Sequence, residues 1–227
     1  MSMSRLELLV NDPNRGCFIT IEGQDGAGKS SNIEAILSVL KERDIKCITT
    51  REPGGTELGE VLRSLLLGSN GTFTGNISDM SELLLVFAAR AQHLEQVIVP
   101  ALEQGTWVVC DRFTDATFAY QGGGRDMGAE TIERLQGLVQ GSFTPDMTVL
   151  LDVPVQVGED RAGARSKPDR FEVENIAFKQ KVRDAYLKLA SDEPDRVKLV
   201  DANKNLKTVK ETVAKLTNEF VSDRKEH

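Results

Sequence analysis

The sequence predicts a single α/β domain in which a five-stranded parallel sheet carries helices on both faces. Short apolar runs rich in β-branched residues alternate with longer amphipathic stretches along the chain. Runs that are apolar on both faces and are separated by helices are typical of a parallel sheet covered on both sides. No repeat, low-complexity tract or Pro/Gly-rich linker divides the chain. The runs expected to form the strands are 17–21, 46–50, 106–110, 147–153 and 196–202.

Two of the amphipathic stretches carry clear helix signals. Residues 31–43 place four apolar side chains at helical spacing. A longer helix is expected to begin at Ser78, a residue type that favours N-caps, and to stop at Gly105. We expect residues 1–15 to be a loosely ordered N-terminal extension and residues 16–227 to form the folded domain.

The composition disfavours several other classes of protein. With 28 basic against 35 acidic residues, the net charge is −7, which disfavours a nucleic-acid partner because duplex binding depends on phosphate neutralisation. No apolar run is long enough to span a membrane, and residues 1–15 lack a secretory pattern. Cys17, Cys47 and Cys110 form neither a CxxC motif nor a Cys/His cluster. We therefore expect buried thiols in a reducing cytoplasm, without zinc or disulfides.

Residues 23–30, GQDGAGKS, match the phosphate-binding P-loop motif, with an expected strand before it and a helix after it. Glycines remove the Cβ atoms that would block a tight turn, so successive N–H groups can converge on phosphate oxygens. Lys29 is expected to neutralise the β/γ-phosphates, and the Ser30 hydroxyl to ligate Mg²⁺. The chain is therefore predicted to bind a nucleoside triphosphate. The loop residues expected to contact it are Gly23, Gln24, Asp25, Gly26, Ala27, Gly28, Lys29, Ser30 and Ser31.

The rest of the chain favours a small kinase among the proteins that carry this loop. A GTPase needs an Asn-Lys-x-Asp guanine signature, and the near-match at residues 203–206, NKNL, lacks the aspartate. A kinase needs a second pocket for its acceptor, and four stretches are suited to build one. They are REPGGT at 51–56, FAAR at 87–90, DRFTDATFAYQGGGR at 111–125 and RAGARSKPDRFE at 161–172.

In this order, and together with the P-loop, these stretches resemble thymidylate kinase of the bacterial type over about residues 17–222. The resemblance implies a P-loop kinase fold with a mobile lid at about 158–171. It implies transfer of the γ-phosphoryl group of ATP to the 5′-phosphate of dTMP, with Mg²⁺, giving dTDP and ADP in dTTP biosynthesis. It also implies a cytoplasmic enzyme that is commonly a homodimer.

The resemblance assigns roles around the acceptor phosphate. Arg112 would hold the phosphate of dTMP, and Asp111 would order Mg²⁺ or its waters together with Ser30. Arg63 matches a second arginine that grips the monophosphate. Asp25 matches an acidic residue near the deoxyribose 3′-hydroxyl. Glu52 belongs to the acceptor site in general.

The base would be read by Arg90, Thr117 and Gln121. A guanidinium can donate to the thymine O4, and a hydroxyl or an amide can pair with the N3/O2 edge. The family usually places a base-stacking Phe four residues before the helical arginine, and Val86 occupies that position here. We expect Phe87, three residues before Arg90, to stack on thymine instead, although the helix can also turn Phe87 into the core and leave Val86 against the base.

Three arginines fall in the stretch that corresponds to the lid, and they are Arg161, Arg165 and Arg170. Eukaryotic-type enzymes carry an arginine in the P-loop where this chain has Gly26. The catalytic arginine is therefore expected from the lid, with Arg165 as the best match and Arg161, a contact to ATP, as the second. The groups expected to act in catalysis are Lys29, Arg112, Arg165 and Asp25.

Two other functions stay open from the sequence. A kinase for another nucleoside monophosphate or nucleoside would use the same loop and lid with a different acceptor. A non-catalytic nucleotide-dependent switch would use the loop alone, although it would have no need of lid arginines. His93 and Trp107 are expected to have structural roles.

Overall fold

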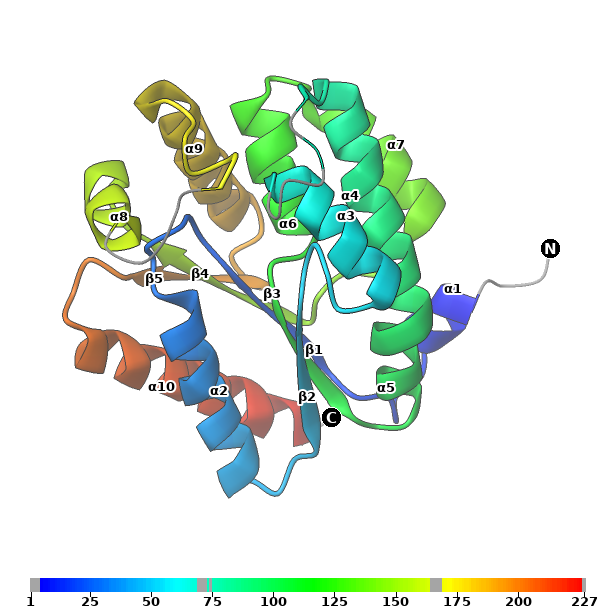
Figure 1. Cartoon of the computed structure of the whole chain (residues 1–227). Coiled ribbons are helices and arrows are strands. Elements are labelled where there is room, and N and C mark those ends of the chain that lie inside the picture. Colours follow the sequence, from blue (N-terminus) through cyan, green and yellow to red (C-terminus); the bar gives the residue numbers. More distant parts are fainter. Residues whose placement is uncertain (1–4, 69–72, 74, 164–168, 226–227) are drawn as a thin grey trace.

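The structure is a computed structural model that describes residues 5–68, 73, 75–163 and 169–225 (Figure 1). The described residues contain one five-stranded parallel sheet, in the strand order β2-β3-β1-β4-β5. The predicted α/β class, the number of strands and their direction are confirmed, and each strand falls on one of the predicted apolar runs. The strands are β1 (Phe18–Glu22), β2 (Cys47–Arg51), β3 (Trp107–Asp111), β4 (Met147–Asp152) and β5 (Val197–Asp201).

Helices cover both faces of the sheet (Figure 1). One face carries α2 (Lys29–Glu42) and α10 (Leu206–Lys225), which pack against each other. The other face carries α4 (Asp79–His93), α5 (Val99–Glu103), α6 (Thr114–Thr117), α7 (Ala129–Val139) and α9 (Ile176–Asp192), with the π-helical segments η2 (Leu94–Ile98) and η3 (Phe118–Gly124). Helix α3 (Glu57–Leu67) packs on α4, and α8 (Val155–Ala162) follows β4.

Alternating side chains of β1 supply the cores of both layers. Ile19 and Ile21 face α2 and α10, where they meet Ile36 and Leu40 among other buried aliphatic residues. Phe18 points to the opposite face, into a cluster that also contains residues of η2, α5 and β3. Strand β1 is buried along its whole length, as expected of a central parallel strand.

The helix predicted from Ser78 is present but is not uniform. The Ser78 hydroxyl accepts a hydrogen bond from the backbone N–H of Ser81, as an N-cap does. The helix changes to π geometry over η2 and continues as α5, which has a proline in its first turn and ends at Glu103. This long helical segment lines the face of the sheet from which the candidate site is built.

The N-terminal segment differs from the loose extension that the sequence suggested. Residues 5–10 form helix α1 (Arg5–Val10), which packs against α5. Leu9 is buried in the cluster around Phe18, and the Arg5 guanidinium lies 2.7 Å from Glu103 and 3.1 Å from Glu95. Helix α1 is therefore held in place by the burial of Leu9 and by the ion pairs of Arg5, although the sequence carries no strong helix signal there.

The register of the strands brings three loops to one edge of the sheet. Ile21 of β1 pairs with Asp111 of β3, which pairs in turn with Arg51 of β2. The segments that follow these strands therefore begin side by side, at the edge where parallel sheets place their ligand contacts.

Within the described residues, no helix has the length and apolar character needed to cross a membrane.

Candidate active site

The loop after β1 turns tightly, and its glycines permit the turn. Gly23, Gly26 and Gly28 have φ angles of 132°, 78° and 92°, in the region that side chains disfavour. A Cβ atom on Gly23 would lie 2.4 Å from the carbonyl oxygen of Leu151, and one on Gly26 would lie 2.1 Å from that of Gly158. The backbone of this loop therefore packs closely against β4 and α8, as only glycine allows.

Lys29 begins α2 and folds its side chain back over the loop. Its Nζ donates hydrogen bonds to the carbonyl oxygens of Gly23, at 3.1 Å, and Gln24, at 3.2 Å. Burial and the charge of Arg112 lower the pKa of Lys29, while Asp25, 3.8 Å away, acts in the opposite direction. The ammonium group is thus held inside the loop, where incoming phosphate oxygens would replace the carbonyl partners.

Arg112 lies directly after β3 with a φ of 68°, a backbone conformation that is uncommon for a residue with a side chain. Its Nη2 donates to Asp25 Oδ1 at 2.8 Å and to the Tyr120 hydroxyl at 3.2 Å. Burial alone lowers the pKa of Arg112, but Tyr120, Asp25 and Asp111 outweigh it and raise that pKa well above its ordinary value. The P-loop and the β3 edge are therefore joined by a permanent positive charge.

Glu22, the last residue of β1, holds the segment that follows Arg112 in place through hydrogen bonds. Its Oε1 accepts the backbone N–H of Phe113 at 2.7 Å, and the Tyr186 hydroxyl lies 2.7 Å from Oε2. Burial, reinforced by the charge of Asp115, raises the pKa of Glu22 to about 8. The carboxyl group therefore keeps its proton at neutral pH, although its ordinary pKa is 4.5.

This raised pKa makes the stability of the fold depend on pH, and Glu22→Gln should remove the part of that dependence that comes from Glu22. Between about pH 4.5 and 8 the unfolded chain releases this proton while the folded chain retains it, so Glu22 by itself lowers the free energy of unfolding by roughly 1.4 kcal/mol per pH unit. The amide keeps the acceptor for Phe113 and offers a donor to Tyr186. We expect the melting temperature of Glu22→Gln, relative to the wild type, to rise from pH 5 to pH 8. A difference in melting temperature between variant and wild type that stays constant from pH 5 to pH 8 would contradict the raised pKa of Glu22.

A cavity of about 100 Å³ opens beside Arg112 and gathers the residues predicted for the acceptor. Residues from the P-loop, the segment after β2, α3, α4, α6 and η3 line it together. All predicted acceptor residues except Phe87 are among them: Asp25, Glu52, Arg63, Arg90, Arg112, Thr117 and Gln121. Arg63 is half-buried and donates to the carbonyl oxygen of Pro53 at 2.9 Å.

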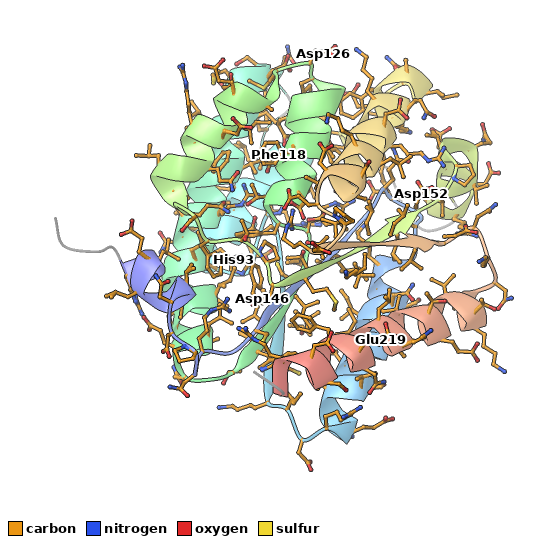
Figure 2. The ribbon with its side chains drawn as sticks, turned by 180° about the vertical axis from the view of Figure 1, so that it is seen from behind. His93, Phe118, Asp126, Asp146, Asp152 and Glu219 are labelled. Atoms are coloured by element: carbon orange, nitrogen blue, oxygen red, sulfur yellow. The ribbon has the colours of Figure 1, made fainter. Side chains whose placement is uncertain are left out.

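Arg90 enters this cavity from α4 as a fully buried charge. Its Nε donates to Glu52 at 2.8 Å, and its Nη2 donates to the Thr117 hydroxyl at 3.0 Å. The other Glu52 oxygen lies 3.0 Å from His93 Nδ1, and His93 Nε2 lies 2.6 Å from the Thr50 hydroxyl. His93 thus lies in the interior (Figure 2), in the structural role expected of it. Nη1 of Arg90 is buried and has no hydrogen-bond partner within the described part of the chain.

Phe87 does not take the place that the sequence suggested. It is 2% exposed and packs in a core cluster with Leu83 and Ile132, 4.9 Å from the Arg90 guanidinium. Val86 lines the acceptor cavity instead. Val86 and Arg90 are four residues apart and share one face of α4, whereas Phe87 is rotated toward α7. The structure therefore turns Phe87 into the core and leaves Val86 on the cavity wall, so the expectation that Phe87 faces the acceptor cavity is wrong here.

Phe87→Ala should therefore act on stability. Removing a buried phenyl ring costs about 3–5 kcal/mol, so the melting temperature should fall by several degrees. In the folded variant the KM for the acceptor should stay close to that of the wild type. Val86→Ala should show the reverse pattern, with a higher KM and a smaller change in melting temperature. A ten-fold rise in acceptor KM for folded Phe87→Ala would contradict this placement.

The residues predicted to hold Mg²⁺ fit a metal that keeps part of its water shell. Oδ1 of Asp111 is buried without a hydrogen-bond partner among the described residues, and Ser30 is exposed at the start of α2. No cluster of three or more His, Cys, Asp or Glu side chains is suited to hold a metal in the described ranges. Mg²⁺ is commonly held by one or two side chains plus substrate phosphates and waters, so this sparse donor set is compatible with it.

The segment predicted to form the lid, residues 158–171, is only partly described. Its first part belongs to α8, where the Arg161 guanidinium donates to the carbonyl oxygen of Ala202 at 3.0 Å. Residues 164–168, and with them Arg165, lie outside the described residues. The predicted catalytic role of Arg165 is therefore a prediction from the sequence alone.

Glu82, in the first turn of α4, is a member of the site that the motifs did not indicate. It is fully buried and accepts hydrogen bonds from Gln121, Arg125 and Arg170. It lies four residues before Val86, on the face of α4 that lines the cavity. The four-residue spacing from Val86 is therefore the sequence signal that would identify Glu82, once it is known which face of α4 points to the cavity.

Comparisons with known proteins agree over most of the chain. The family model described as thymidylate kinase matches residues 21–213. The thymidylate kinase of Methylobacillus flagellatus is 48% identical to this chain over 206 residues, which are 91% of this chain and 98% of the relative. That of Pseudomonas putida is 51% identical over 198 residues, 87% of this chain and 93% of the relative. The crystal structure of thymidylate kinase from Ehrlichia chaffeensis matches with a TM-score of 0.70 and 32% identity, over 89% of this chain and 98% of that one.

Proposed function

This chain belongs to the thymidylate kinase family, and we propose from that premise that it transfers the γ-phosphoryl group of ATP to dTMP. An oxygen of the dTMP 5′-phosphate attacks the γ-phosphorus. The bond from that phosphorus to the β,γ-bridging oxygen breaks, giving dTDP and ADP. The acceptor is already an anion, so no base has to remove a proton. Positioning and charge neutralisation are then the main tasks of the protein.

The observation that carries this proposal is the buried guanidinium of Arg90, which belongs to a residue that lines the acceptor cavity and whose Nη1 has no hydrogen-bond partner among the described residues. A buried charge with an open donor is unfavourable unless a ligand completes it. The thymine O4 is an acceptor of the required kind, and the 4-amino group of cytosine is not. Arg90 is also fixed by Glu52 and Thr117, so its open donor has a defined direction.

The phosphate groups would meet the positive charges at the edge of the sheet. Lys29 and the loop N–H groups bind the β/γ-phosphates of ATP, and Arg161 contacts ATP from α8. Arg112 and Arg63, which both line the acceptor cavity, bind the 5′-phosphate of dTMP. Asp25 orients Arg112 and lies near the 3′-hydroxyl of the deoxyribose.

Ser30, through its hydroxyl, and Asp111, through waters, would hold Mg²⁺, which would supply charge neutralisation on the triphosphate. The residues of this chain do the rest of the positioning. Oδ1 of Asp111 supports that role: it lies 3.8 Å from Arg112 Nη1 but is buried without a hydrogen-bond partner among the described residues, so it can accept from a metal-bound water.

An ADP-release assay with a panel of acceptors tests this function. Turnover should require ATP, Mg²⁺ and dTMP, and dCMP and GMP should be poor acceptors because hydrogen-bonding groups of the site would stay unpaired. dUMP lacks only a methyl group, which is worth roughly 1 kcal/mol, and should be a weaker substrate. Equal turnover of dTMP and dCMP, or nucleotide binding without turnover, would contradict the proposal.

We also propose that residues 158–171 close over ATP as a lid.

We propose further that the chain works as a cytoplasmic homodimer. Large apolar side chains are exposed on the neighbouring helices α3 and α4, and a second copy would cover them. They are Leu58, Val61, Met80 and Leu84. Sedimentation velocity of the chain in solution tests the dimer directly.

A further inference from the structure

Glu82 is the centre of a buried polar cluster between the acceptor cavity and the segment that follows residues 164–168. Nε2 of Gln121 lies 2.7 Å from Oε1 of Glu82, and Nη2 of Arg125 lies 3.2 Å from Oε2. Nη2 of Arg170 also contacts Oε2. Glu82 is fully buried, and a buried carboxylate is tolerated only with partners such as these.

The cluster is built from parts of the fold that also shape the acceptor cavity. Glu82 and Val86 are four residues apart on α4, and Arg90 follows after four more, so the three share one helical face. Gln121 belongs to η3 and lines the cavity together with Val86 and Arg90. Arg170 is anchored separately, since its Nε donates to the carbonyl oxygen of Leu66 at 2.9 Å.

The contact with Glu82 fixes which end of the Gln121 amide faces the cavity. A glutamine amide has a donor end and an acceptor end of nearly the same shape, and rotation by 180° exchanges them. A carboxylate accepts hydrogen bonds and does not donate them. The NH₂ group of Gln121 therefore turns to Glu82, and the carbonyl oxygen Oε1 is the branch left for a ligand.

An acceptor at this position suits thymine and opposes cytosine. The N3 atom of thymine carries a hydrogen and its O4 accepts, whereas N3 of cytosine accepts and its 4-amino group donates. Oε1 of Gln121 complements the N3–H group, and Nη1 of Arg90 complements O4. We propose that Glu82 is a positioning residue that locks the Gln121 amide in the orientation that selects thymine over cytosine. This inference rests on the proposed acceptor site.

Glu82→Gln tests this positioning role because it should reverse the orientation of the Gln121 amide. Nη2 of Arg125 and Nη2 of Arg170 both contact Oε2, whereas Oε1 meets Gln121 at 2.7 Å and Nε of Arg125 at a longer 3.4 Å. The new carbonyl should therefore face the two Nη2 groups, and the new NH₂ group should face Gln121. Gln121 then turns its own carbonyl to position 82 and its NH₂ group to the cavity. The kcat/KM for dTMP should fall and that for 5-methyl-dCMP should rise. Their ratio should shift by at least about ten-fold, a modest part of what an unpaired polar group costs.

The substrate pair isolates the base edge because both nucleotides carry the 5-methyl group and differ only at positions 3 and 4. Glu174→Gln is the matched control. It removes another carboxylate partner of Arg125, at 2.5 Å, without touching Gln121, so the ratio should stay at the wild-type value. If Glu82→Gln fails to fold, Glu82→Asp keeps the charge but withdraws it from Gln121 by one methylene, and the ratio should again fall.

A folded Glu82 variant that loses activity equally on both substrates would overturn the inference, since that is the pattern of a purely structural residue. The failure of the proposed function looks different. In that case the wild type itself would not prefer dTMP to 5-methyl-dCMP, and no Glu82 variant would be needed to show it.

Discussion

Arg112→Ala should lower kcat/KM for dTMP by at least about 10³-fold under the role proposed for Arg112, in which its guanidinium holds the acceptor phosphate and acts in catalysis. In the structure it lines the acceptor cavity and is held 2.8 Å from Asp25 Oδ1 and 3.2 Å from the Tyr120 hydroxyl. The alanine variant loses this charge and also leaves Asp25 without its closest cationic partner. KM for dTMP should rise and kcat should fall, while KM for ATP changes little. Initial rates over both substrate concentrations separate these effects.

Arg112→Lys is the control for charge alone. A lysine keeps the positive charge but has no planar fork with which to contact Asp25 and a phosphate at once. We expect an intermediate kcat/KM, closer to the alanine variant than to the wild type. If the alanine variant keeps wild-type KM for dTMP, the acceptor phosphate is bound elsewhere in the cavity, and Arg63 is the next residue to change.

Strong local motifs made much of the site predictable from the sequence. The glycines of the loop have the positive φ angles that the motif requires, and the register of β1, β2 and β3 brings Glu22, Arg51 and Asp111 to one edge. Parallel strands always place their carboxyl ends together, so residues after different strands can be assigned to one site before the structure is known.

Helix rotation and partner choice were not predictable in this way. Phe87 and Val86 both lie within a turn of Arg90, and only packing of Phe87 against Ile132 decides which of them faces the cavity. Glu82 is an ordinary acidic residue near a helix N-terminus until Arg125 and Arg170 are seen beside it. Such residues gain their roles from contacts over long sequence distances, which a single sequence does not encode as a motif.

Arg165→Ala should lower kcat by at least about 10²-fold with little change in KM for dTMP, as expected for a charge that acts in the transition state. The P-loop has Gly26 after Asp25, and a Cβ atom on Gly26 would meet the Gly158 carbonyl oxygen at 2.1 Å. No arginine side chain can therefore be supplied from that position without moving α8. The source that we propose for the charge is the stretch 161–170, in which the arginines are Arg161, Arg165 and Arg170.

Arg161 and Arg170 are the two of these arginines that the structure describes, and both have partners. Arg161 donates to the carbonyl oxygen of Ala202, and Arg170 contacts Glu82 and the carbonyl oxygen of Leu66. Arg161→Ala should consequently cost less in kcat than Arg165→Ala, and its main effect should be on KM for ATP. Single-turnover rates with saturating ATP and dTMP measure the chemical step directly. A normal rate for Arg165→Ala together with a strongly reduced one for Arg161→Ala would exchange the two roles, and would mean that the contact with Ala202 breaks when ATP binds.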